Sequence, residues 1–243
     1  MEVFLINYIN IVKFAKEMKK FIVIPAYNEE NTIEKVIDSL FLEGYENIVV
    51  VDDGSKDQTY NLAKSKNVIV LRHMLNRGQG AALQTGITYS IIKGAEIIIH
   101  FDADGQHDAK EIKNLVMPIE EGITQISLGS RFLSKQTLPF MRKLFLKIGV
   151  LVIWIFYGIK LSDSHNGFRA FSRKAAKKVI ITTDKMEHAS EIIDKIKRNK
   201  IKYKEIPVTI RYTKETLKNG RKGQGRFDSI EIVMKMFLKK VGL

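Results

Sequence analysis

Residues 97–108 read IIIHFDADGQHD, an apolar run that ends in two aspartates separated by one small residue. The run has the length and composition of a buried strand. Asp102 and Asp104 would then lie at its carboxyl end, where two carboxylates can share one divalent cation and Gln106 can add a neutral oxygen. Such oxygen ligands suit Mg²⁺ or Mn²⁺. An acidic turn without a ligand would show the same pattern, so both interpretations stay open.

A second acidic turn precedes this one, in VVVDDGSKDQT at residues 49–59. Asp53 follows a continuous apolar run, and a carboxylate at the end of such a strand can accept hydrogen bonds from a nucleobase or a ribose. The other interpretation is structural, with Ser55 or Asp57 capping the next helix. Both roles can hold at once.

The segment PAYNEENT at residues 25–32 follows the first apolar run of the clear fold pattern. Pro25 and Tyr27 could flank a flat base, and Glu29 could supply a polar contact. The alternative is a loop that only leads into a helix.

Around these segments, short apolar runs alternate with helical periodicity. The predicted strands cover 21–25, 47–51, 68–71, 97–101, 124–130, 167–172 and 201–211, and the predicted helices include 57–66, 79–92, 109–121 and 185–199. This alternation predicts an α/β fold, with a mostly parallel central sheet and helices on both of its faces. In such sheets ligands bind at the carboxyl ends of the strands, where the acidic turns lie.

The composition limits the classes of function. The 243 residues include 40 Lys and Arg against 27 Asp and Glu, a net charge of +13, and no cysteine. Disulfides, thiolate zinc sites, iron–sulfur clusters and a cysteine nucleophile are therefore excluded. The positive excess points to an anionic partner: a phosphate ligand, a nucleic acid or a membrane surface.

The chain divides into three parts. Residues 18–212 form the predicted catalytic domain, and residues 213–243 form a basic C-terminal tail that includes a candidate amphipathic helix. Residues 1–17 are either an additional helix or the product of an upstream start codon, since the clear pattern begins at Met18.

No transmembrane helix is predicted. The longest uncharged apolar stretch runs from Ile148 to Ile159, and a spanning helix needs about 20 residues. A signal peptide is not expected either, because the start lacks an early Lys or Arg. Residues 140–160 read as a helix buried against the sheet, with a membrane-surface helix as the less favoured alternative.

Seven segments in order resemble the family 2 glycosyltransferases, which have the GT-A fold and bind nucleotide-diphospho-sugars. The closer similarity is to the branch of dolichyl-phosphate mannosyltransferases and polyprenyl-phosphate glycosyltransferases. The segments are VIPAYNEENT, VVVDDGSKDQT, NRGQGAALQTGI, HFDADGQHD, LGSRF, SHNGFRAFSR and EIPVTIRY. They extend from Val23 to Tyr212, about four fifths of the chain.

This resemblance implies a UDP-sugar or GDP-sugar as the donor. It implies that the base and ribose pocket is lined by Pro25, Tyr27, Glu29 and Asp53. It further implies that Asp102 and Asp104 hold Mg²⁺ or Mn²⁺ on the donor diphosphate, with Gln106 beside them. The metal would balance the negative charge that develops on the leaving group.

Two basic residues resemble phosphate contacts of the family. Arg131 lies in LGSRF, and Arg211 begins the basic segment where related enzymes carry a loop that closes over the donor. Here that segment reads TIRYTKETLKNGRKGQGRF and departs from the shorter arginine and glycine loop of the mannosyltransferases. The sugar and the acceptor therefore stay open.

The resemblance implies inverting transfer to a polyprenyl or dolichyl phosphate by an enzyme in the cytoplasm, peripheral at the inner membrane face. A phosphate acceptor is already an anion and needs no base. The alternative acceptor is a glycan or another hydroxyl, which would need a base: Asp163, or else Glu191. Asp163 could instead be a turn residue that pairs with Arg169.

Two other readings rank lower. A nucleic-acid-binding protein would use the basic tail, but that tail has few aromatic residues for stacking, so no nucleic acid partner is expected. A dinucleotide-binding fold is disfavoured because NRGQGAAL has Leu83 at the third glycine position. Its glycines instead indicate close backbone packing at a helix start. The oligomeric state is not predicted.

Overall fold

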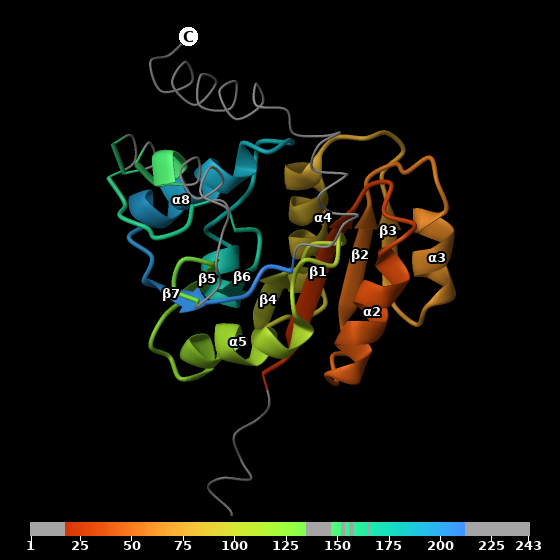
Figure 1. Cartoon of the computed structure of the whole chain (residues 1–243), viewed down its shortest axis with the longest axis horizontal. Helices are drawn as coiled ribbons and strands as arrows, with labels where there is room; N and C mark the ends of the chain where they lie inside the picture. Colours follow the sequence, from red (N-terminus) through yellow and green to blue (C-terminus); the bar gives the residue numbers. More distant parts are fainter. Residues whose placement is uncertain (1–17, 135–146, 152–153, 156–157, 165, 212–243) are drawn as a thin grey trace, which may run out of the picture.

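A computed structural model describes residues 18–134, 147–151, 154–155, 158–164 and 166–211 (Figure 1). Its strands are β1 (Lys20–Ala26), β2 (Ile48–Asp52), β3 (Ile69–Arg72), β4 (Ile97–His100), β5 (Ile126–Ser130), β6 (Arg169–Ser172) and β7 (Tyr203–Pro207). Its α-helices are α2 (Ile33–Leu42), α3 (Thr59–Ser65), α4 (Gln79–Ile92), α5 (Ile112–Glu120), α7 (Arg173–Ala176) and α8 (His188–Arg198), and a short 3₁₀ turn, η1 (Ala109–Glu111), precedes α5.

The seven strands form one sheet in the order β3-β2-β1-β4-β6-β5-β7. The four strands β3, β2, β1 and β4 run parallel, and β7 runs parallel to β5. Only β6 is reversed, since it pairs antiparallel with both β4 and β5. The sheet is thus mixed but mostly parallel, as the sequence predicts.

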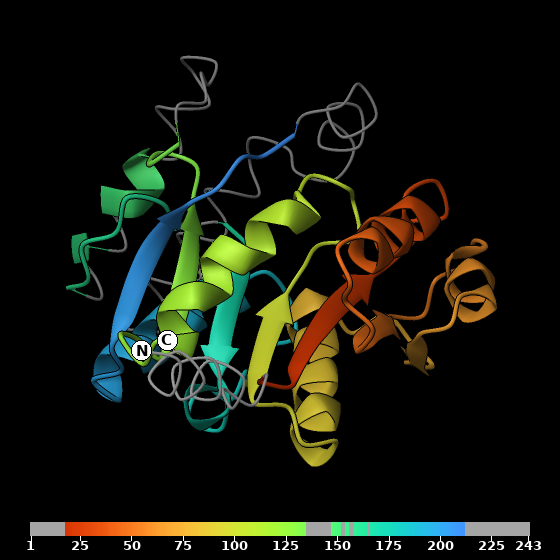
Figure 2. The ribbon, with the colours of Figure 1, turned by 90° about the horizontal axis from the view of Figure 1, so that it is seen from below.

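Helices cover both faces of the sheet (Figure 2). Alternate side chains of each strand enter different cores, because the side-chain period of a strand is two residues. Ile22 and Ile24 of β1 pack with α2, α3 and α5, whereas Phe21 and Val23 pack with α4, α7 and α8. Burial on both faces explains why these strands read as unbroken runs of Ile and Val rather than as alternating patterns.

The predicted boundaries differ from the structure at a few points. The last predicted strand, 201–211, forms β7 only over Tyr203–Pro207, and the helix predicted at 109–121 starts as the 3₁₀ turn η1. The predicted burial of the helix near residue 150 is wrong for the side chains described there, because Trp154 and Ile155 are exposed. The predicted extension 1–17 and tail 213–243 lie outside the described residues.

Within the parts of the chain that the structure describes, no helix combines the length and the apolar character that crossing a bilayer requires.

Candidate active site

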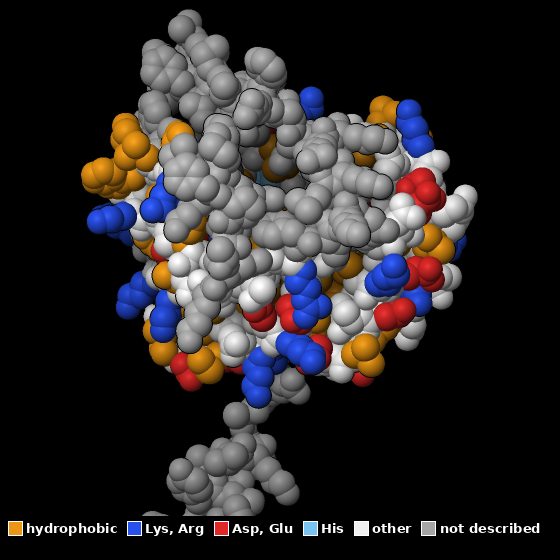
Figure 3. Space-filling view, viewed as in Figure 1, with side chains coloured by type: hydrophobic (Ala, Val, Ile, Leu, Met, Phe, Trp, Pro, Cys, Tyr) orange, Lys and Arg blue, Asp and Glu red, His pale blue; other side chains and the backbone are white. Residues whose placement is uncertain are grey.

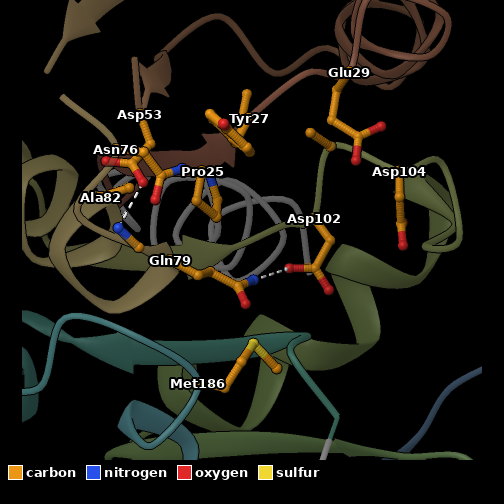
Figure 4. Close-up of a pocket in the computed structure, with 13 residues that line it drawn as sticks. Pro25, Tyr27, Glu29, Asp53, Asn76, Gln79, Ala82, Asp102, Asp104 and Met186 are labelled. Carbon is orange, nitrogen blue, oxygen red and sulfur yellow. Dashed lines mark hydrogen bonds between the residues drawn. The ribbon is translucent and has the colours of Figure 1, made fainter. Parts of the chain in front are cut away.

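A cavity of about 400 Å³ opens at the carboxyl ends of β1, β2 and β4, beside the start of α4 (Figure 4). This is the edge at which a parallel sheet leaves room for a ligand between diverging loops. Six residues singled out from the sequence line it together: Pro25, Tyr27, Glu29, Asp53, Asp102 and Asp104.

Asp102 is held rigidly at the floor of the cavity. Its Oδ1 accepts a hydrogen bond of 3.0 Å from Gln79 Nε2, and its Oδ2 lies 2.9 Å from His107 Nε2. A Cβ on Gly167 would lie 2.5 Å from Asp102 Oδ2, so only glycine fits there without displacement. Burial raises the pKa of Asp102, but His107 and Arg169 outweigh it and keep the pKa below its usual value. Asp102 is therefore an anion in a fixed position.

Asp104 lies two residues further along the same turn and points the same way as Asp102 (Figure 4). Its Oδ1 accepts a hydrogen bond of 3.0 Å from the backbone N–H of Gln106. Burial, and then the charge of Asp102, raise the pKa of Asp104 to about 6. Negative charge thus accumulates at this turn without a full set of protein cations to balance it.

These two carboxylates fit a divalent cation that is shared with a ligand. The described residues contain no group of three or more His, Asp or Glu side chains placed to hold a metal ion. Mg²⁺ typically takes one or two protein carboxylates and completes its shell with water and substrate phosphates. The donor set of Asp102 and Asp104 matches that pattern. The Gln106 side chain does not line the cavity, and Gln106 contributes through its backbone bond to Asp104.

Asp53 joins the end of β2 to the start of α4. Its Oδ2 accepts a hydrogen bond of 2.6 Å from Gly78 N, and its Oδ1 accepts one of 3.1 Å from Arg77 N. His73 Nδ1 lies 2.6 Å from the same Oδ1. Asp53 therefore shapes the cavity wall as well as facing the cavity.

The loop that follows β1 forms the neighbouring part of the cavity wall (Figure 4). Tyr27 is 41% exposed and presents its ring at the cavity edge. Glu29 is anchored by its backbone N–H, which donates to Thr59 Oγ1 at 2.7 Å, and by Thr32 Oγ1, which donates to its carboxylate at 2.8 Å. Burial raises the pKa of Glu29, with Asp104 contributing in the same direction. The loops after β1 and β2 thus form one bonded unit around the cavity.

Arg131 and Asp163 form a buried ion pair outside the cavity lining. Asp163 Oδ2 accepts hydrogen bonds from Arg131 Nε at 2.6 Å and from Arg131 N at 3.2 Å. Glu205 of β7 in turn accepts from the backbone N–H groups of Ser162 and Asp163. Asp163 is thus bonded to Arg131, and its charge also favours the charged form of Arg169, the partner that the sequence suggested.

Arg211 lies next to the turn that carries Asp102 and Asp104. Its side chain bonds to Asp108, its backbone N–H donates to Gln106 O at 2.9 Å, and the side chain is 60% exposed. A cation is therefore available at the rim, near Asp104.

Glu191 is bonded to neighbouring residues of the protein. Its carboxylate accepts hydrogen bonds from Thr182, from Thr183 and from Lys195 Nζ at 2.7 Å. Burial raises the pKa of Glu191, but these hydrogen bonds outweigh burial and lower the pKa to about 2. Glu191 is not among the described residues that line the cavity. A saturated carboxylate of so low a pKa is unsuited to accept a proton, so we do not retain Glu191 as a candidate base.

The turn held by Glu191 packs against the start of α4. A Cβ on Gly80 would lie 2.1 Å from Thr183 O, and one on Gly78 would lie 2.5 Å from Asp184 O. This close approach accounts for the glycines of NRGQGAAL and agrees with the packing role predicted for them. It also brings Met186 to the cavity wall (Figure 4).

Sequence reasoning missed several residues of the site. Asn76, Gln79 and Met186 line the cavity, and the buried side chains of His100, Arg169 and His188 lie behind Asp102. Gln79 lies inside a motif that the resemblance covers, so its place in NRGQGAAL was an available signal. No sequence signal indicated Met186, because it reaches the cavity only through tertiary packing.

Comparisons with known proteins agree with the geometry. The model of the family "Glycosyl transferase family 2" matches residues 21–180. The chain is 40% identical over 227 residues to the uncharacterized protein MJ1222 of Methanocaldococcus jannaschii, covering 91% of this chain and 92% of that protein. It is 33% identical over 223 residues to the UDP-N-acetylglucosamine–dolichyl-phosphate N-acetylglucosaminyltransferase of Methanococcus voltae, covering 82% and 88%.

A solved structure shows the same fold. Glucosyl-3-phosphoglycerate synthase from Mycobacterium tuberculosis, crystallised with Mn²⁺ and UDP-glucose, superposes with a TM-score of 0.70 at 18% identity, covering 97% of this chain and 83% of that one. At that identity the likeness establishes the GT-A fold alone. The family match and the relatives go further: the chain belongs to glycosyl transferase family 2, as a glycosyltransferase of the polyprenyl-phosphate branch.

Proposed function

We propose that this glycosyltransferase moves a sugar from a UDP-sugar or GDP-sugar to a polyprenyl phosphate, with inversion at the anomeric carbon and with Mg²⁺ or Mn²⁺ at Asp102 and Asp104. The cavity at the ends of β1, β2 and β4 carries the proposal. It combines an aromatic and acidic wall suited to a nucleoside with two carboxylates suited to a metal diphosphate.

The donor would lie across the cavity. Tyr27 and Pro25 offer flat apolar surface to a base, and Asp53 lies beside them with its carboxylate fixed by Gly78 and Arg77. A divalent cation, when bound, would neutralise charge on the leaving diphosphate. Gln79 and His107 hold Asp102 in place for that contact.

Other basic residues would complete the diphosphate site. Arg211 is mostly exposed and bonds to Asp108 within the metal-binding turn, so its guanidinium can approach a phosphate. Arg131 is buried and bonded to Asp163, so we propose that it acts by holding Asp163 and the segment around Ser162 in place.

A phosphate acceptor fits this chain better than a hydroxyl acceptor. A phosphate monoester is anionic at neutral pH and can attack the anomeric carbon from the face opposite the diphosphate without a base. Asp163, the remaining candidate base, is buried and bonded to Arg131 rather than free to receive a proton. The relative in Methanococcus voltae is named for transfer to dolichyl phosphate. A lipid acceptor would place the enzyme at the inner face of a membrane.

A donor screen tests this proposal. The full chain would be mixed with Mn²⁺ and each of several UDP-sugars and GDP-sugars, with and without dolichyl phosphate, and nucleoside diphosphate release would be measured. We expect one donor to give release that depends on both Mn²⁺ and the lipid phosphate. Release that responds only to a sugar hydroxyl acceptor would support the alternative acceptor, and no response to any donor would refute the proposed activity.

A further inference from the structure

One helical segment exposes a row of large apolar side chains. Residues 147–151 and 154–155 are helical, and Ile148, Leu151, Trp154 and Ile155 are 46%, 48%, 51% and 65% exposed. Their spacing of three and four residues places them on one side of a helix. We call these four residues the Trp154 face. Figure 3 shows hydrophobic side chains gathered at this corner of the molecule, with Lys and Arg beside them.

The segment is attached to the fold by its following residues. Ile159 and Leu161 are buried in the core with Ile193 and Ile196 of α8. Lys197 Nζ of α8 donates to Gly158 O at 2.8 Å. The end of the helix is therefore fixed against α8, while the Trp154 face points away from that core.

Lysines border this face, and the part of the chain that carries it has an excess of basic residues. Exposed Lys147 and Lys160 flank the segment, and residues 147–211 contain 15 Lys and Arg against 6 Asp and Glu. By contrast, residues 18–134 contain 12 against 16. An exposed apolar row bordered by cations is complementary to a bilayer with anionic headgroups, where the apolar side chains enter the interface and the lysines contact the headgroups. A tryptophan is well suited to that interface.

We propose that the Trp154 face docks the protein on the surface of an anionic lipid bilayer. This inference rests on the proposed function, because an enzyme that uses a polyprenyl phosphate must reach it at a membrane. The docking itself needs no donor, metal or acceptor, so it can be measured separately from transfer.

Trp154 is the only tryptophan of the chain, so its fluorescence reports on this face alone. The full chain would be titrated with vesicles of phosphatidylcholine, with or without phosphatidylglycerol. With the anionic vesicles we expect the emission to move to shorter wavelength and to be quenched by brominated acyl chains. Phosphatidylcholine alone should give much weaker binding.

Substitutions that keep the tryptophan identify the binding surface. Ile148→Ser with Ile155→Ser should lower the partition coefficient by about tenfold or more, because two apolar side chains no longer enter the interface. The matched control is Leu42→Ser with Ile92→Ser, two apolar residues that are 86% and 75% exposed elsewhere. The control should bind as the unmodified chain does.

Four results would overturn the inference. Binding unchanged in the Ile148 and Ile155 variant would assign it to another segment, as would binding without quenching of Trp154. A lipid-independent emission shift that grows with protein concentration would show that a second copy covers the face. Failure of docking with intact transfer to a short-chain acceptor would remove this inference and leave the proposed function standing.

Discussion

Four acidic side chains lie in two contrasting regions of this molecule. Asp102 and Asp104 follow β4 and face an open cavity, where two negative charges accumulate. Asp163 and Glu191 lie outside the cavity lining and are bonded to Arg131, to Lys195 and to two threonines. All four were plausible functional residues by sequence. The contrast shows that what separates the two pairs is whether the carboxylate faces the cavity, since Asp102 is also bonded within the protein, to Gln79 and His107.

The largest effect on activity should come from substitution of Asp102 or Asp104, which face the cavity. Asp104→Asn keeps the shape of the side chain but removes a negative charge from the turn at which we propose that the metal binds. We expect kcat/KM for transfer to fall about a thousandfold or more, because the diphosphate loses its cation. Activity would be assayed at saturating Mn²⁺, with thermal unfolding as a check that the fold survives. Asp38→Asn is the control, since Asp38 pairs with Lys66 on the surface and should leave transfer unchanged.

Substitutions of Asp163 and Glu191 should instead change the stability of the fold. Asp163→Asn removes the negative charge that acts on the buried Arg131 and Arg169 guanidiniums, and we expect a loss of about 3 kcal/mol in the free energy of unfolding. Urea denaturation measures this loss. Adding Arg131→Gln should recover part of it, because one of the two cations is then gone. If the folded variant lost only transfer to a hydroxyl acceptor, Asp163 would have to be reinstated as a base.

Gly167→Ala tests how closely Asp102 must be held. The added methyl would lie 2.5 Å from Asp102 Oδ2 and must displace the carboxylate. We expect about a hundredfold loss in kcat/KM, since a small misplacement of a positioning group has effects of that size. Gly94→Ala is the control: its φ of 88° makes the substitution strained, but its Cβ meets open space. The control should lower stability and leave kcat/KM intact, and equal activity losses would contradict the assigned role of Gly167.

The smallest effect concerns Glu191 and depends on pH. Its pKa of about 2 lies below the ordinary 4.5, so the carboxylate stabilises the fold above pH 4.5 and this contribution is lost as the pH falls toward 2. Glu191→Gln should cost about 2 kcal/mol at pH 7. The difference from the unmodified chain should shrink at pH 3 in urea denaturation.

The control for this prediction lies on the same helix. Asp194→Asn breaks a surface pair with Arg198 and should cost less than about 1 kcal/mol at pH 7. A Glu191→Gln effect that stayed constant from pH 7 to pH 3 would show that the carboxylate charge is not what stabilises the turn.

Much of the site follows from the sequence because it is local to strand ends. Asp53, Asp102 and Asp104 each follow a buried run, and parallel strands bring such ends to one edge of a sheet. The partners that decide which carboxylate is free come from distant segments. Gly167 reaches Asp102 because β6 pairs with β4 in reverse, and the turn near Met186 reaches the cavity through the glycines of α4. No local sequence pattern predicts either of these contacts.

Local sequence patterns also could not predict that Trp154 and its neighbours are exposed. An apolar segment of helical spacing fits a buried helix and a surface helix equally well, because periodicity does not state what lies opposite. Burial of Ile159 and Leu161 beside α8, and not of Ile155, is a property of the packed structure.

The most direct measurement is the chemical identity of the product. A labelled sugar nucleotide that supports release in the donor screen would be incubated with dolichyl phosphate and the full chain, with Mn²⁺ or with excess chelator. We predict a sugar joined to the lipid phosphate with its anomeric configuration inverted, formed with Mn²⁺, absent with chelator and absent for Asp104→Asn. A product of retained configuration, or one formed equally with chelator, would contradict the account.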